Sequence, residues 1–273
     1  MCGRYVMARA TSDLVALGDA ETNEELVLRQ SWNVAPTAEV PILVAHADDV
    51  GAGVTRRIHV ARWGLVPPWA KELSVGSRAF NARSETVASK PTFRAAVRAR
   101  RCAVPVEGYY EWKTPEPGAK GPDGRAAKKQ PYYVHPAGAG DGEGPVIWFA
   151  GLYEWWQDPE AKAAGEDAWV LSTTILTMAA PDADDDDPVL AALGQLHDRM
   201  PVPMDAEAMD RWLAPDTLGS AEEADALVGQ VCAGAYDVAA GWSLRPVGGA
   251  VGNVRNNGPE LIQEMREHQG TLL

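Results

Sequence analysis

Cysteine is scarce in this chain, and its spacing fits neither a disulfide framework nor a zinc ribbon. Only three of the 273 residues are cysteine, and Cys2, Cys102 and Cys232 form no CxxC pair. The sequence also lacks an HExxH motif, an EF-hand loop and a strand–loop–helix phosphate loop. We therefore expect no metal and no other cofactor.

Long apolar runs are missing as well. No stretch approaches the roughly 18–20 residues that a membrane-spanning helix needs. The start, MCGRYVMARATSD, lacks the basic and apolar regions of a secretory signal. We expect a monomer in the cytoplasm, without membrane contact, that is associated with the nucleoid if DNA is its partner.

Positive charge is in short supply overall, since the formal net charge is −13. Such a balance opposes non-specific binding to nucleic acid, which rests on neutralising phosphates. Between residues 78 and 101, however, seven basic residues face one acidic residue, Glu85, for a local net charge of +6. The seven are Arg78, Arg83, Lys90, Arg94, Arg98, Arg100 and Arg101. Because binding depends on the local field, this window predicts a basic face on an acidic body.

The pattern of apolar residues favours an α+β fold with a mixed or antiparallel β core and peripheral helices. Runs rich in β-branched and aromatic residues predict strands at 40–45, 58–66, 101–112, 130–136, 145–156 and 168–176. Helices are predicted at 12–18, 90–100, 205–213, 221–233 and 259–267. With no repeat and no long linker, residues 1–273 are expected to form a single domain.

Two stretches have the composition of surface insertions. Residues 114–129 carry Gly, Pro and mixed charge, which predicts a flexible extension of a hairpin. Residues 179–188 contain five aspartates, and the repulsion between their carboxylates is expected to disfavour compact structure.

The cysteine at position 2 has a distinctive chemistry. Once Met1 is removed, Cys2 carries an α-amine and a thiol on adjacent carbons. Such an aminothiol condenses with an aldehyde to an imine, and the thiol then closes a five-membered thiazolidine. The alternative is that Cys2 is simply a small residue beneath a strand.

GYYEWK at 108–113 places a carboxylate among aromatic residues. Strand alternation puts Tyr109 and Glu111 on one face. In such surroundings the pKa of Glu111 would rise, and the group could act as a general acid or base near neutral pH. Alternatively, Glu111 pairs with an arginine on a half-exposed strand.

LHDRMP at 196–201 combines a histidine with two charged neighbours. His197, Asp198 and Arg199 offer a proton-transfer group, an orienting carboxylate and a phosphate-binding guanidinium. A turn histidine that caps the next segment is the simpler interpretation.

FNARSE at 80–85 and RWGLVPPWA at 62–70 are candidates for contact with nucleic acid. Asn81 and Arg83 share a face if the chain is extended there, which suits phosphate and sugar contacts. An edge strand with solvated side chains would give the same pattern. Trp63 is expected in the core, whereas Trp69 beside a basic groove could stack on bases.

Taken together, these stretches resemble the SRAP family, the SOS response-associated peptidases. The matching segments are MCGRY, WNVAPT (32–37), RWGLVPPWA, FNARSET (80–86), RCAVPVEGYYEWK (101–113), LSTTILT (171–177), LHDRMPVPM (196–204) and GNVRNNGPELI (252–262). They follow the family's order over nearly the whole chain. Two departures are the absence of an Ala-Asn ending after LSTTILT and the longer, more acidic stretch before LHDRMP.

The resemblance implies a sensor of abasic sites in single-stranded DNA that crosslinks to them. Cys2 would form the thiazolidine, Glu111 would assist opening of the sugar ring, Asn81 would hold the N-terminal region, and His197 would lie near the deoxyribose. DNA contacts are expected from Arg4, Trp69, Arg83 and Arg199. Lyase activity is a conceivable side reaction.

Two other classes of function stay open on the sequence. One is a thiol peptidase that uses Cys2, His197 and Glu111, with its own leader as one conceivable substrate. The other is a non-catalytic module that binds modified bases, which would not need the thiol. A protease should act on peptides and ignore DNA.

Overall fold

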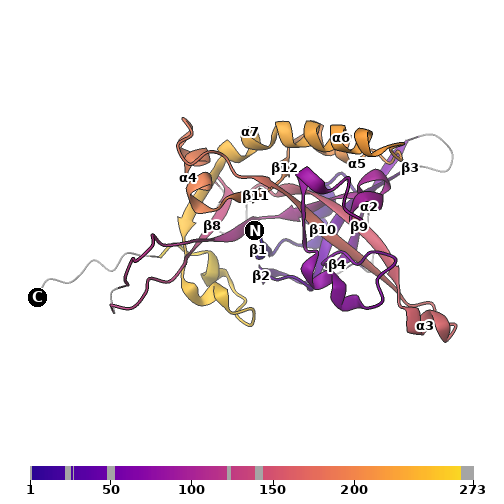
Figure 1. The fold of residues 1–273 in the computed structure, drawn as a ribbon, viewed down its shortest axis with the longest axis horizontal. Coiled ribbons are helices and arrows are strands. Elements are labelled where there is room, and N and C mark those ends of the chain that lie inside the picture. The colour runs from indigo at the N-terminus through magenta and orange to yellow at the C-terminus, as the bar shows by residue number, and fades with distance from the viewer. Residues whose placement is uncertain are drawn as a thin grey trace, which may run out of the picture.

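All six predicted strand runs form strands in the computed structural model of the chain (Figure 1). The structure describes residues 2–21, 26, 28–47, 53–121, 124–138 and 144–265. The architecture is α+β and single-domain, as expected, with two sheets and peripheral helices. One continuous cluster of buried side chains draws residues from both sheets and from the helices.

The larger sheet closes on itself. Its strands run in the order β10-β4-β3-β6-β9, and β9 pairs again with β10. These strands are β3 (Glu39–Ala47), β4 (Val54–Trp63), β6 (Arg101–Val106), β9 (Ile147–Gln157) and β10 (Trp169–Ala179). Three short strands are attached to this ring: β5 (Asn81–Arg83) and β11 (Arg199–Pro201) to β10, and β12 (Pro203–Met204) to β9.

The smaller sheet is antiparallel throughout and has the order β13-β8-β7-β1-β2. Its strands are β1 (Tyr5–Met7), β2 (Ser31–Val34), β7 (Gly108–Lys113), β8 (Gln130–Pro136) and β13 (Trp242–Pro246). The predicted run 101–112 divides between β6 and β7, so the chain passes there from one sheet to the other. Glu107 sits at this passage, where its carboxylate accepts from the Ala8 amide and pairs with Arg9.

Helices lie at the periphery, and α5 to α7 run along one side of the molecule (Figure 1). The helices are α1 (Thr11–Leu17), α2 (Arg94–Ala99), α3 (Pro159–Ala163), α4 (Pro188–Leu196), α5 (Ala206–Leu213), α6 (Ala221–Ala233) and α7 (Ala235–Ala240). The 3-10 turns are η1 (Leu73–Arg78), η2 (Ser84–Thr86), η3 (Gly249–Gly252) and η4 (Pro259–Ile262). None of the helices in the described ranges is long and apolar enough to span a membrane.

The helix predictions at 12–18, 205–213 and 221–233 are confirmed. The helix predicted at 90–100 begins only at Arg94, because residues 91–93 form a turn that Phe93 anchors in the core. The segment predicted at 259–267 forms only the turn η4, and residues 266–267 lie outside the described part. We did not predict α3, α4 and α7.

The two insertions behave differently. The described part of 114–129 extends the β7–β8 hairpin, with an isolated bridge between Lys120 and Ala126. The expectation of a loose stretch at 179–188 is wrong. Asp187 caps the start of α4 through the amides of Val189 and Leu190, and Gln195 of α4 donates to Ala183 O. Aspartate side chains thus serve as local hydrogen-bond acceptors that order this loop rather than repel one another out of it.

Candidate functional site

Antiparallel pairing of β1 with β7 brings the start of the chain to Glu111. Tyr5 lies opposite Tyr109, and Tyr110 donates its amide to Arg4 O at 2.9 Å. Continuing this register places Cys2 beside the part of β7 that carries Glu111. Both side chains are buried, Cys2 completely and Glu111 at 5% exposure. The expected alternation is confirmed, because Tyr109 packs in the main core whereas Tyr110 packs in a second cluster behind β7.

Asn81 fixes the backbone of Cys2 from the other sheet. Strand β5 runs parallel to β10, with Asn81 opposite Ile175. From there the Asn81 side-chain amide donates a hydrogen bond of 2.8 Å to Cys2 O. This hydrogen bond joins Asn81 to Cys2, 79 positions earlier in the chain, and both residues belong to the predicted site.

The surroundings of Cys2 keep its thiol protonated. Burial raises the pKa of the thiol well above its ordinary value, and the negative charge of Glu111 raises it further. The Sγ atom lies 4.0 Å from Arg4 O, the one acceptor it has among the described hydrogen bonds. A carboxylate next to a neutral thiol is suited to receive the thiol's proton when sulfur forms a bond.

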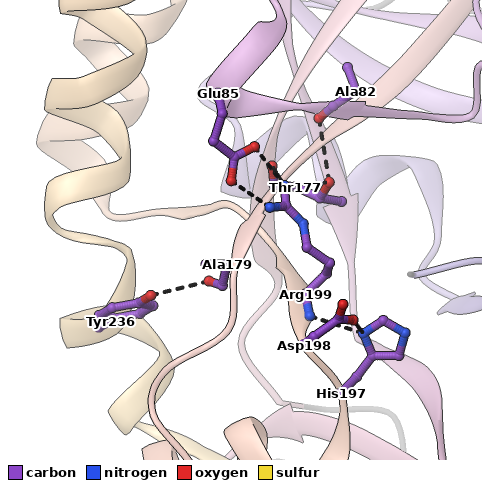
Figure 2. A network of polar contacts seen from close by, with 8 residues as sticks. All are labelled: Ala82, Glu85, Thr177, Ala179, His197, Asp198, Arg199 and Tyr236. Carbon is purple, nitrogen blue, oxygen red and sulfur yellow. Dashed lines mark hydrogen bonds and ion pairs between the residues drawn. The ribbon is translucent and has the colours of Figure 1, made fainter.

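His197 ends α4, the helix that packs against β7. Its Nδ1 accepts from the Arg199 amide at 2.9 Å and lies 2.7 Å from an oxygen of Asp198 (Figure 2). One nitrogen cannot serve both partners in the same state. With a hydrogen on Nδ1 the ring donates to Asp198, and without one Nδ1 accepts from the Arg199 amide, so this nitrogen has a partner in either form.

Arg199 lies on β11 next to β10 and forms a network with Glu85 and Thr177 (Figure 2). Its guanidinium pairs with both oxygens of the Glu85 carboxylate and donates to Thr177 O at 2.6 Å. The predicted phosphate-binding group is thus engaged by a carboxylate in this structure. The pairing lowers the pKa of Glu85.

A cationic cleft lies next to Asn81. The η1–α2 cleft, as we call it, has a volume of about 820 Å³. Its lining includes Val75, Arg78, Asn81, Arg83, Lys90 and Phe93. Arg78, Arg83 and Lys90 are exposed. The basic window therefore contributes three cations to a cleft that begins at the residue holding Cys2.

The rest of the basic window does not all face solvent. Arg101 is 5% exposed and donates five hydrogen bonds to backbone carbonyls. Arg98 binds the carbonyls of Leu218 and Gly219, and Arg100 pairs with Glu154. The predicted basic face is therefore formed only in part, since three of the seven cations of the window bond within the fold.

The two tryptophans divide as expected. Trp63 is fully buried and packs edge-on against Tyr5 and Phe80, whereas Trp69 is 62% exposed. The loop that carries Trp69 is tightly fixed, because Gly64 and Gly76 touch backbone to backbone and Gly64 has a φ of +132°. A side chain on Gly64 would lie 2.5 Å from Gly76 O.

Asn33, in the WNVAPT stretch, contacts the predicted site residue Arg4, although we did not single it out. It is buried, accepts from Arg4 at 3.5 Å, and its amide is directed at the carbonyls of Val251, Asn253 and Asn256. It thus joins the start of the chain to the GNVRNN segment. Two separated Asn-containing stretches were the only sequence signal for this contact.

Most of the chain matches the model of a known protein family. The family model described as SOS response associated peptidase (SRAP) matches residues 1–254. The chain belongs to the SRAP family. The resemblance inferred from the motifs is confirmed.

Relatives within the family carry names that refer to abasic sites. The chain is 30% identical to the abasic site processing protein YoqW of Bacillus subtilis, over 96% of this chain and 99% of that protein. It is 28% identical to the abasic site processing protein HMCES of Rattus norvegicus, over 85% of this chain and 64% of that protein.

Solved structures support the fold. A protein from Bacteroides thetaiotaomicron superposes with a TM-score of 0.69 at 20% identity, covering 97% of this chain and all of the other. A phage-related protein from Bordetella bronchiseptica gives a TM-score of 0.54 at 25% identity, covering 90% of this chain and 94% of the other.

Proposed function

We propose that this SRAP protein processes abasic sites in single-stranded DNA by bonding covalently to them through Cys2. The observation that carries the proposal is the convergence on Cys2 of Asn81, which holds its carbonyl, and of Glu111, whose charge acts on its thiol. Relatives named for the processing of abasic sites support the choice of substrate. Removal of Met1 exposes the required α-amine.

The reaction needs one amine, one thiol and one aldehyde. The amine of Cys2 adds to the C1′ aldehyde of the ring-opened sugar, and loss of water leaves an imine. The thiol then adds to the imine carbon, and its proton ends on the nitrogen, which closes the thiazolidine. Glu111, whose charge acts on the thiol, is proposed to carry that proton and to assist opening of the sugar ring. His197 and Arg83 are proposed to lie against the sugar and its phosphates.

The environment of the thiol favours this chemistry over peptide hydrolysis. A cysteine protease depends on a thiolate, which an adjacent cation stabilises. Here burial and the Glu111 carboxylate raise the pKa of the thiol and outweigh the lowering by the N-terminal amine, so the net effect acts against the thiolate. Addition to an electrophilic imine, with a carboxylate as base, proceeds from the neutral thiol. The peptidase in the family's description is thus the weaker proposal for this site.

Incubation with an abasic single-stranded oligonucleotide tests the proposal. The wild-type protein should give a slower, heat-stable band on a denaturing gel, and Cys2→Ser should not, because oxygen closes a much weaker ring. Borohydride should still trap the imine of Cys2→Ser. Cys232→Ala is the matched control and should crosslink normally, because Cys232 is half-buried on α6.

Some outcomes would contradict the proposal. Normal crosslinking by Cys2→Ser without reductant would exclude the thiazolidine. Unchanged binding and no adduct with either protein would instead support a non-catalytic module. Strand cleavage in the same gel would reveal lyase activity, and peptide cleavage without any DNA adduct would favour the peptidase. A variant that retains Met1 should also fail, because its Cys2 nitrogen is an amide.

Glu111→Gln tests the proton-transfer role. The amide keeps the shape of the side chain but cannot carry a proton. Crosslinking and its reversal should slow, within the range of about 10²–10⁴-fold that general acid–base catalysis typically contributes. Time courses of adduct formation at saturating protein measure the effect. An unchanged rate constant would make Glu111 a structural residue of β7.

A further inference from the structure

A second groove borders the Cys2 region on the side of the smaller sheet. This β2 groove, as we call it, has a volume of about 580 Å³ and lies between β2, the start of β3 and the segment 254–257. Its lining includes Arg29, Ser31, Asn33, Glu39, Val254 and Arg255. The chemistry described above does not use it.

The β2 groove is linked to the start of the chain through Arg4, whereas the η1–α2 cleft is linked directly to Cys2. Asn81 lines the η1–α2 cleft and binds Cys2 O, whereas Asn33 lines the β2 groove and accepts from Arg4. Arg4 lies two residues from Cys2, and its carbonyl faces the Cys2 thiol. One asparagine from each sheet thus lines a groove and bonds to the start of the chain, Asn81 at Cys2 and Asn33 at Arg4.

One wall of the β2 groove is held rigidly in place. Asn33 reaches three carbonyls of the 251–256 segment, at 2.9 to 3.3 Å. Asn257 accepts from the Trp32 amide at 2.7 Å and from the Ser31 hydroxyl at 3.4 Å. These bonds fasten the segment to β2, so the groove needs no rearrangement to receive a ligand.

The charges in the β2 groove suit a phosphate backbone. Arg29 and Arg255 are both exposed. Among the described residues, the lining has one acidic residue, Glu39, which lies opposite Arg62 in the β3–β4 pairing, so the two arginines outnumber the carboxylates of the groove. Val254 is 56% exposed beside Arg255 and offers an apolar surface to a sugar or base. The protein as a whole has a net charge of −13, so the two arginines give this groove a local excess of positive charge.

We infer that the β2 groove binds the single-stranded DNA that flanks the reacting sugar on one side, while the η1–α2 cleft binds the flank on the other. The inference rests on the proposed function. An abasic site inside a strand has a flank on each side, and the η1–α2 cleft accounts for one of them. Arg29 and Arg255 contact phosphates, and Asn33 is a positioning residue that keeps Arg4 and the groove wall in register.

Two oligonucleotides separate the grooves. Each carries a tetrahydrofuran abasic analogue, which has no aldehyde, close to one end, so that one has only a 5′ flank and the other only a 3′ flank. Binding to each is measured as a function of salt concentration. Arg29→Ala/Arg255→Ala should weaken binding of one oligonucleotide and flatten its log–log salt slope by about 1.4, from two phosphate contacts of about 0.7 each. Arg83→Ala/Lys90→Ala should do the same to the other.

The matched control is Arg211→Ala. Arg211 is an exposed arginine on α5, paired with Glu207, and it lines neither groove. It should leave both salt slopes unchanged. Circular dichroism confirms that each variant is folded.

The inference is supported if each double variant weakens binding of one oligonucleotide only, and the two double variants affect different oligonucleotides. If Arg29→Ala/Arg255→Ala affects both oligonucleotides equally, or neither, the assignment of the β2 groove is wrong. Because the analogue cannot react, this result is independent of the covalent chemistry. Failure of wild-type protein to crosslink genuine abasic versions of the same strands would overturn the proposed function, whatever the binding pattern.

Discussion

The basic segment between Arg78 and Arg101 contains two groups of cations with opposite roles. Arg78, Arg83 and Lys90 are exposed and line a cleft that begins at Asn81. Arg98, Arg100 and Arg101 point into the fold and bind carbonyls or a buried carboxylate. The two groups are adjacent in sequence and identical in formal charge.

From this difference we expect a cation to contribute to DNA binding only if its hydrogen-bond donors are not already used within the fold. A guanidinium has five donors, and Arg101 places all five bonds on carbonyls at the end of α2 and around the connection from α5 to α6. Arg83 lies at the rim of an open cleft. Substitutions of the exposed cations should change DNA affinity and leave stability nearly the same. Substitutions of the cations that bond within the fold should change stability and leave DNA affinity nearly the same.

The largest expected effect belongs to Arg101. In Arg101→Met the carbonyls of Trp212, Ala214 and Asp216 lose a buried charged donor, so unfolding free energy should fall by about 3–5 kcal/mol. The melting temperature should drop by about 10 °C. Calorimetry or denaturant unfolding measures the loss. Arg101→Lys keeps the charge with fewer donors and should lose less.

The division into two groups would be wrong if Arg101→Met had the melting temperature of the wild type but bound DNA poorly. Arg101 would then belong to the binding group despite its 5% exposure. A stable variant with normal binding would show that water replaces the guanidinium at those carbonyls.

Arg83→Ala should give the opposite result. Loss of one phosphate contact flattens the log–log salt slope for single-stranded DNA by about 0.7. Stability should change by less than about 0.5 kcal/mol, because Arg83 is exposed. Arg98→Ala is the matched partner and should lower stability while the salt slope stays the same. If the two variants had equal effects in both assays, the division into two groups would be wrong.

The strands were predictable because each carries its own signal. β-branched and aromatic runs such as 130–136 and 168–176 need no distant partner to be recognised. The helix α4 was missed because five aspartates precede it, and their sequence indicates repulsion. The structure uses Asp187 as a helix cap, a role that depends on where the next residues turn.

The members of the candidate site could be proposed from the sequence, but their contacts with one another could not. GYYEWK and FNARSE contain Glu111 and Asn81, and alternation correctly placed Tyr109 and Glu111 on one face. The partner of Arg199 could not be foreseen, since Glu85 lies 114 residues away and meets it because β5, just before Glu85, and β11 both pair with β10. Likewise, the sequence does not tell an arginine bound to carbonyls from one in a cleft.

The smallest expected effect concerns Glu85, the carboxylate that pairs with Arg199. With this carboxylate Arg199 resembles the cations that bond within the fold, and without it we expect Arg199 to act like the exposed cations. Arg199 lowers the pKa of Glu85, so the pair stabilises the fold above the unfolded carboxyl's pKa of about 4.3 and loses that contribution as pH falls through the lower folded value. Because the Glu85 side chain is half exposed, the contribution should be below about 1 kcal/mol. Urea unfolding should therefore show a smaller unfolding free energy for Glu85→Gln than for the wild type near neutral pH, and this difference should vanish in acid.

At neutral pH the same variant leaves Arg199 without its carboxylate partner, and the log–log salt slope for DNA binding should steepen by up to about 0.7. If the slope instead stays at the wild-type value, the bond from Arg199 to Thr177 O alone is enough to keep this arginine in the structural group.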